Sequence, residues 1–102
     1  MRIIKDSRLR ESAKRYSRAS VSLKNWRTVT RQANWQSFED LKSTFSSADQ
    51  ITLPNGYRVV VFNIGGGVFR LITAVHFNRG IVYIRKFLTH AQYSKEDWKN
   101  DP

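Results

Sequence analysis

The sequence contains no cysteine and only two histidines, His76 and His90. The absence of cysteine excludes disulfide bonds and thiolate zinc sites, and it agrees with a reducing compartment, so we expect a cytoplasmic protein. Neither histidine has a cluster of carboxylates near it in the sequence, which leaves no recognisable ligand set for a catalytic metal. We therefore expect a protein that uses no metal and no other cofactor.

Several catalytic and targeting signatures are also missing. The run Gly65-Gly66-Gly67 is not followed by the Lys-Ser/Thr of a phosphate-binding P-loop, and we interpret it as a hairpin turn. No serine lies in a nucleophile-elbow pattern, and no pair of carboxylates has the placement that glycosidases use. No apolar run approaches the length of a membrane span, and residues 1–5 are too short for a secretory signal, so we expect no membrane contact.

Acidic residues are scarce. The 102 residues include 8 Asp and Glu against 18 Lys and Arg, which gives a formal net charge of +10. Such an excess in a small chain favours a polyanionic partner, most often nucleic acid. A basic surface that serves solubility, or one neutralised by an acidic protein, is the alternative. The length indicates one domain, residues 1–102, with a single modest core.

The middle of the chain predicts an antiparallel meander. The stretch 57–77 is rich in β-branched and aromatic residues and forms two strands around the glycine turn, and a third strand, 81–88, follows Asn78-Arg79-Gly80. Residues 2–5 predict an edge strand, whereas residues 46–50 predict a loop. Helices are expected after an Asp6-Ser7 cap, after Ser20, after a Ser37 cap and after a Thr89/Gln92 capping box. The fold class is therefore α+β, with N-terminal helices packed on one face of a small antiparallel β-sheet and a short C-terminal helix.

The turns predict which side chains share a face, because directly opposed residues of a hairpin point the same way. A two-residue turn within the glycine run places Asn63 and Arg70 on one face. An Arg79-Gly80 turn pairs Ala74 with Arg85 and His76 with Tyr83. One mixed face then carries Asn63, Arg70, His76, Tyr83 and Arg85 between the apolar residues Val59, Val61, Ile72 and Phe87. A one-residue change in either loop would reverse this pattern.

The opposite face is more continuously apolar, and we expect the helices to cover it. It carries Val60, Phe62, Leu71, Thr73, Val75, Phe77, Val82, Ile84 and Leu88. Lys86 falls on this face in the same register, where its amine would reach water at the margin of the sheet. The mixed face is left as a half-solvated, concave surface that suits an anionic ligand.

The residues left for chemistry are arginines, histidines and tyrosines, a set that suits metal-independent cleavage of RNA. In that reaction the 2′-hydroxyl attacks the adjacent phosphate, arginines stabilise the developing charge, and His or Tyr moves protons. Arginine fits this role because its planar fork binds phosphate bidentately and stays protonated. Many basic domains contain the same residue types, so the inventory alone does not decide the function.

Three motifs taken together resemble the HigB toxins, a family of RelE-like toxins from bacterial type II toxin–antitoxin systems. The motifs are VFNIGGGVFRLI at 61–72, VYIR at 82–85 and THAQY at 89–93. The family pattern is F-N-I-G-G-N-x-x-R-L-I, then Y-I-R, then T-H-x-x-Y-D. Similar residues occur upstream at Trp26, Ala33-Asn34-Trp35, Asp40-Leu41, Phe45 and Ala48-Asp49. The resemblance spans nearly the whole chain, with two departures: Gly67 replaces an asparagine, and Ser94 replaces an aspartate.

The resemblance implies a ribosome-dependent mRNA endoribonuclease that a cognate antitoxin silences. The antitoxin would be a helix-turn-helix DNA-binding protein, so that DNA is contacted only through it. Arg70 and Arg85 would hold the scissile phosphate, and His90 or Tyr93 would act as acid or base. The RNA-binding candidates are Asn63, His76, Tyr83 and Lys86. Two alternatives remain at this point: a non-catalytic basic module that binds RNA or a ribosomal component, and a protein-interaction subunit.

Overall fold

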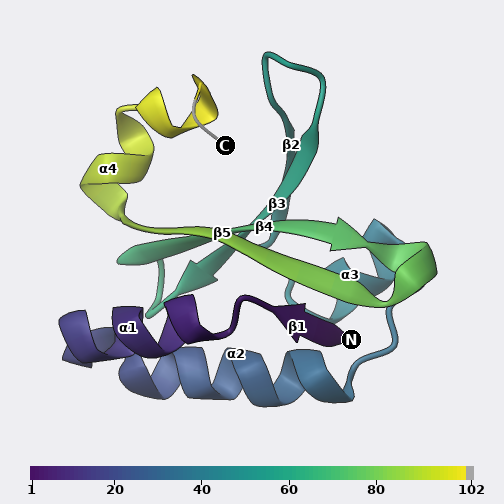
Figure 1. Ribbon diagram of the computed structural model, residues 1–102, viewed down its shortest axis with the longest axis horizontal. Coiled ribbons are helices and arrows are strands. Elements are labelled where there is room, and N and C mark those ends of the chain that lie inside the picture. Colours follow the sequence, from purple (N-terminus) through teal and green to yellow (C-terminus); the bar gives the residue numbers. More distant parts are fainter. Residues whose placement is uncertain (101–102) are drawn as a thin grey trace.

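A computed structural model describes residues 1–100, in which a five-stranded sheet has the order β1-β5-β4-β3-β2 (Figure 1). The strands are β1 (Arg2–Ile4), β2 (Asp49–Thr52), β3 (Arg58–Ile64), β4 (Phe69–His76) and β5 (Ile81–Thr89). The helices are α1 (Ser7–Arg15), α2 (Ser20–Gln32), α3 (Phe38–Thr44) and α4 (His90–Ser94). Short 3₁₀ turns occupy Ser17–Ala19, Phe77–Arg79 and Asp97–Asn100.

The predicted fold class is confirmed, with helices against an antiparallel meander of β3, β4 and β5 and a short C-terminal helix. The predicted edge strand is also present, but β1 runs parallel to β5, with Arg2 opposite Ile81, so the sheet is mixed.

The sequence did not predict β2. Its four residues pair antiparallel with the start of β3, where a loop was expected up to Gln50. A strand this short carries too few alternating positions to stand out from a loop.

The main core lies between the helices and the predicted apolar face of the sheet. Leu23 and Trp26 of α2 are buried against this face, and the Trp26 ring meets Phe62 edge-on at 5.2 Å. The core also contains Leu9, Leu41, Val60, Leu71, Val82 and Ile84. In Figure 1, α1 and α2 lie side by side on one side of the sheet. Each large apolar side chain buried here stabilises the fold by roughly 1.5–3 kcal/mol.

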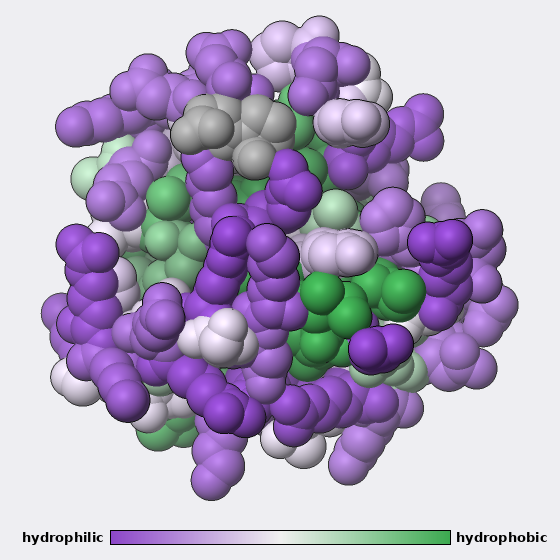
Figure 2. All heavy atoms as spheres, in the orientation of Figure 1, coloured by the Kyte–Doolittle hydropathy of each residue, from purple (hydrophilic) through white to green (hydrophobic). Residues whose placement is uncertain are grey.

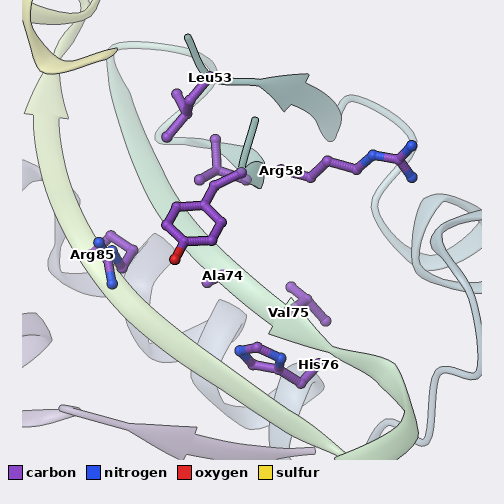
Figure 3. Close-up of a pocket in the computed structure, with 8 residues that line it drawn as sticks. Leu53, Arg58, Ala74, Val75, His76 and Arg85 are labelled. Atoms are coloured by element: carbon purple, nitrogen blue, oxygen red, sulfur yellow. The ribbon is translucent and has the colours of Figure 1, made fainter. Parts of the chain in front are cut away.

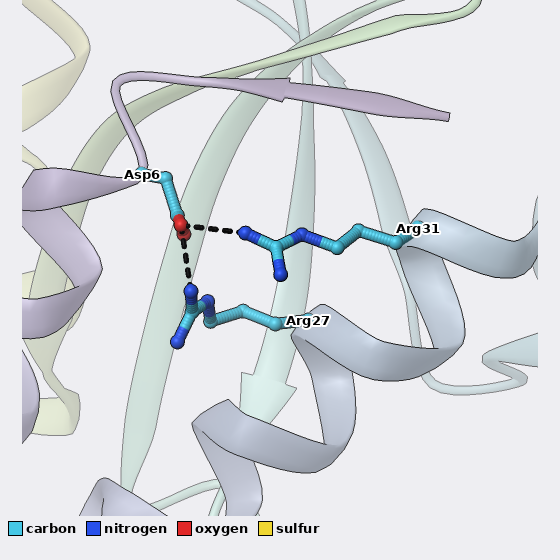
Figure 4. A network of polar contacts seen from close by, with 3 residues as sticks. All are labelled: Asp6, Arg27 and Arg31. Atoms are coloured by element: carbon cyan, nitrogen blue, oxygen red, sulfur yellow. Dashed lines mark hydrogen bonds and ion pairs between the residues drawn. The ribbon is translucent and has the colours of Figure 1, made fainter.

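Asp6 joins the start of α1 to α2 and does not cap α1 as the sequence suggested. Its backbone is helical and its carboxylate makes no cap hydrogen bond. Its Oδ2 instead accepts from Arg27 Nη2 at 2.7 Å and from Arg31 Nη2 at 2.8 Å (Figure 4). Two cations of α2 are thus ion-paired with the residue that precedes α1. The Ser37 cap and the Thr89/Gln92 capping box form as predicted.

A second, smaller core lies on the mixed face. Trp98, from the turn after α4, is buried against Val61 of β3, Ile72 of β4 and Leu53 of the β2–β3 hairpin. In Figure 1, α4 and the turn at Asp97–Asn100 lie on the side of the sheet away from α1 and α2. The mixed face is therefore only partly open, because the C-terminal segment covers its centre.

Figure 2 shows one face covered mostly by hydrophilic residues, with hydrophobic atoms visible in patches between them. Within the part of the chain that the structure describes, no helix is both long enough and apolar enough to cross a membrane.

Candidate active site

The glycine turn places Asn63 and Arg70 as the sequence predicted. The two residues are directly opposite each other in the β3–β4 ladder. Gly67 in the turn has a φ of 94°, a backbone conformation that side-chain-bearing residues rarely adopt. Its carbonyl accepts a hydrogen bond from Arg70 Nη1. A Cβ at this position would lie 3.2 Å from the same nitrogen, so glycine leaves room for the Arg70 side chain to fold back over the turn.

The connection between β4 and β5 differs from the predicted one. Residues 77–80 contain a 3₁₀ turn, and Ala74 pairs with Tyr83, whereas the sequence predicted a pairing with Arg85. The register is offset by two residues, which leaves the side chains on their predicted faces. His76 and Tyr83 accordingly share a face, with ring centroids 6.0 Å apart.

A β-bulge then changes the second half of β5. Thr73 pairs with Ile84 but Ile72 pairs with Lys86, so the register shifts by one residue at Arg85. Arg8 of α1 reaches this point: its Nη1 donates to the carbonyl of Arg85 at 2.9 Å and to that of Ile84 at 3.4 Å. Because Arg8 contacts both carbonyls, it ties the bulge to α1.

The prediction was wrong for the three residues after the bulge, because it assumed an unbroken ladder. Lys86 and Leu88 lie on the same face as Arg70, with Leu88 packed against the second core. Phe87 turns toward the helices, where its ring stacks on Phe69 at 5.2 Å. One inserted residue reverses every later side chain of a strand.

Tyr93 and Arg70 are brought into contact by α4. The Arg70 guanidinium lies 5.3 Å from the centre of the Tyr93 ring, within the range of a cation–π interaction. Trp98 stacks on Tyr93, with ring centroids 5.2 Å apart, and its indole Nε1 donates to the Tyr93 carbonyl at 3.0 Å. The tyrosine is thus held between Arg70 and Trp98.

Burial raises the pKa of the Tyr93 hydroxyl above its usual value, and the Asp49 carboxylate acts in the same direction. The cations of Arg70 and Lys99 oppose this shift in pKa without cancelling it. Tyr93 is therefore protonated at neutral pH and can donate a proton. Asp49 lies in a stretch that the sequence predicted as a loop, and no role in the site was predicted for it.

His90 is the first residue of α4, one turn before Tyr93. Its backbone N–H donates to the carbonyl of Val68 in the glycine turn at 3.0 Å, which fixes the start of the helix beside that turn. The imidazole is exposed. Residues three apart on a helix lie on neighbouring parts of its surface, so the His90 and Tyr93 side chains lie at the same end of the sheet.

Arg85, His76 and Tyr83 lie further along the mixed face than Arg70. Arg85 and His76 line a cavity of about 320 Å³ together with Tyr57, Arg58, Val59 and Ala74. Figure 3 shows Arg85 and His76 on either side of Ala74, with the Arg58 guanidinium extending away from them. Ala74 lies four positions after Arg70 along β4, about 13 Å at the rise of a strand. The predicted site residues thus form two groups along one face.

No group of three or more His, Asp or Glu side chains that could hold a metal ion occurs among residues 1–100. The chemistry visible in the described residues is that of guanidinium groups, tyrosine and histidine. Such groups can bind an anion, stabilise developing negative charge and transfer a proton.

Comparison with known proteins identifies the family. The profile of the HigB toxin family, described as the RelE-like toxic component of a toxin–antitoxin system, matches residues 19–96. The chain is 28% identical over 93 residues to the mRNA interferase toxin HigB of Escherichia coli K12, covering 91% of this chain and 88% of the relative. A protein named mRNA interferase HigB from Escherichia coli O6:H1 is 23% identical over 95 residues, which is 93% of this chain and 90% of the relative. The chain therefore belongs to the HigB family of RelE-like toxins, the toxic components of toxin–antitoxin systems.

Proposed function

We propose that this protein is an mRNA interferase, an endoribonuclease that cuts messages on translating ribosomes without a metal ion and is silenced by its antitoxin. The observation that carries the proposal is the placement of the Arg70 guanidinium over the Tyr93 ring, with Arg85 on the same face. The net charge of +10 and the names of the relatives support an RNA substrate. The site of action is the cytoplasm, where messages are translated.

The reaction that fits these groups is attack by a ribose 2′-oxygen on the neighbouring phosphorus. The 2′-oxygen loses its proton, the bond from phosphorus to the 5′-oxygen breaks, and that 5′-oxygen must take up a proton. Arg70 and Arg85 are assigned to the non-bridging phosphate oxygens, because a fixed guanidinium stabilises charge that grows in the transition state. Removing one such donor costs on the order of 10²- to 10³-fold in rate.

The raised pKa of Tyr93 suits a proton donor to the leaving 5′-oxygen better than a base, because a base must start deprotonated. We assign His90 as the group that accepts the 2′-proton, since it begins the helix that carries Tyr93. Asn63 lies opposite Arg70 and is assigned to orient the message at the glycine turn. His76, Tyr83 and Lys86 extend the RNA-binding surface along the sheet.

The partners follow from this proposal. The antitoxin would be a small helix-turn-helix protein encoded next to the toxin gene, through which alone the pair contacts DNA. The ribosome would present single-stranded message to the mixed face. A purely RNA-binding module would share the charge but would leave the message intact.

Expression in bacterial cells tests the function. The chain is induced alone and together with the adjacent gene, and the ends of cellular messages are mapped. We expect growth arrest and cuts within translated messages in the first case and neither in the second. Purified protein is then added to naked message and to the same message on programmed ribosomes, and cutting is expected only on ribosomes. Growth arrest with intact messages would overturn the proposal in favour of the binding module.

A further inference from the structure

Tyr57 presents an exposed aromatic ring beside the candidate site. The residue is 69% exposed, although it directly precedes a strand whose Val59 and Val61 are buried. Both backbone polar groups of Tyr57 are hydrogen-bonded. Its N–H donates to Asn55 Oδ1 at 3.0 Å, and its carbonyl accepts from Leu53 N–H at 2.7 Å. The ring is therefore held on an ordered turn without being used in either core, an arrangement that leaves its face available to a ligand.

The cavity next to Tyr57 has the composition of a site for a planar, partly charged ligand. Its floor is apolar where Val59 and Ala74 lie, and His76 and Arg85 supply polar groups at its sides. Its volume of about 320 Å³ is at the lower end of the range for small-molecule sites. Apolar floor, aromatic wall and guanidinium together match a nucleotide, whose base stacks on aromatic rings and whose phosphate binds arginine.

The position of the cavity connects it to the proposed chemistry. Arg85 lines the cavity and is also assigned to the scissile phosphate, so a message held by Arg70 and Arg85 would extend past Tyr57. The distance of about 13 Å between Arg70 and Ala74 along β4 can be spanned by a short single-stranded segment of message.

We propose that the pocket between Tyr57 and Arg85 is a subsite for one unpaired base of the message, next to the nucleotide that is cut. The proposal rests on the function proposed above and adds the residue that holds a flanking base. Tyr57 stacks on the base, Val59 and Ala74 form the floor beneath it, and Arg85 contacts the phosphate that joins it to the cut site.

Messages that lack single bases test the subsite. Ribosomes are programmed with a set of messages, each carrying one abasic ribose near the cut, and kcat/KM is measured for wild type, Tyr57→Ala and Tyr57→Phe. Loss of base stacking weakens binding by about tenfold. We expect one abasic position to slow wild type by about that factor and to have no further effect on Tyr57→Ala, which is already slow. Tyr57→Phe keeps the ring and should behave as wild type does.

Gln32→Ala on α2 serves as the control, because Gln32 is exposed and lies on a different element. All variants should melt within a few degrees of wild type, since exposed substitutions change stability little. If Tyr57→Ala cuts every message as fast as wild type, or keeps the same sensitivity to the abasic position, the subsite is overturned while the function stands. If wild type leaves all messages intact, the proposed function is wrong and the subsite falls with it.

Discussion

The Arg70 guanidinium lies 5.3 Å from the centre of the Tyr93 ring, although 23 positions separate the two residues in the sequence. The glycine turn sets the Arg70 end of this pair, and the capping box that begins α4 sets the other. A phosphate can approach a guanidinium held in this way without first ordering its side chain, which lowers the entropic cost of binding.

Arg70→Ala should therefore abolish growth arrest and lower the rate of message cleavage on the order of 10²- to 10³-fold. Arg70→Lys should recover little of this, since an ammonium group cannot bind phosphate bidentately. Arg79→Ala removes the same charge from an exposed turn and serves as the control. The idea of a phosphate clamp fails if purified Arg70→Ala melts as wild type does and still cuts message at an unchanged rate.

Tyr93 should ionise only above pH 10. Its folded-state pKa is raised, chiefly by burial and then by Asp49, against an unfolded value of about 10. The folded state thus keeps this proton to higher pH, and the associated stability is present below pH 10 and lost as the pH rises through the raised pKa. The difference between wild type and Tyr93→Phe in tyrosinate absorbance isolates this titration. A transition below pH 10 in that difference would contradict the assignment of Tyr93 as proton donor.

Trp98 should hold Tyr93 in place as well as fill the second core. Trp98→Ala should destabilise the protein by about 3–5 kcal/mol, because it empties a buried site. Trp98→Phe keeps the stacking partner and loses the hydrogen bond to the Tyr93 carbonyl, at a cost of about 0.5–1.5 kcal/mol. Urea unfolding measures both. If Trp98→Ala unfolds at the same urea concentration as wild type, the C-terminal turn does not pack on the sheet as described.

Arg8 should act as a positioning residue for Arg85, because its guanidinium donates to both carbonyls of the bulge. Arg8→Ala should lower kcat about tenfold if Arg85 loses its place as a transition-state donor, while the net loss of stability stays near 1 kcal/mol. Arg10→Ala is the matched control, since it removes an equal charge from the same helix and Arg10 is also exposed. Equal kinetics for the two variants would show that Arg8 contributes charge alone.

The sequence predicted those parts of the site that depend on residues close together in the chain, and it did not predict those that depend on contacts between distant residues. Asn63 and Arg70 face each other as expected, because three glycines fix the turn between them. The capping box at Thr89 was also predictable, since it is a local pattern. The sequence prediction placed Lys86, Phe87 and Leu88 on the wrong faces, because no local pattern marks the bulge at Arg85. The carbonyl of Arg85 accepts a hydrogen bond from Arg8, which is 77 residues away. The position of Trp98 on the mixed face likewise comes from tertiary packing, which a local sequence pattern does not predict.

The last prediction concerns the ends of the cut message, which report the chemistry directly. Attack by the 2′-oxygen retains the phosphate on the upstream fragment, as a 2′,3′-cyclic phosphate or the 3′-phosphate formed when it opens, and leaves a 5′-hydroxyl downstream. A message with a 2′-deoxy sugar at the cut position lacks the nucleophile and should stay intact at that position. His90→Gln should still bind programmed ribosomes but cut slowly if His90 accepts the 2′-proton, and Tyr93→Phe should slow the departure of the 5′-oxygen. Fragments from wild type that carry a 5′-phosphate would rule out this mechanism, because water rather than the ribose would then be the nucleophile.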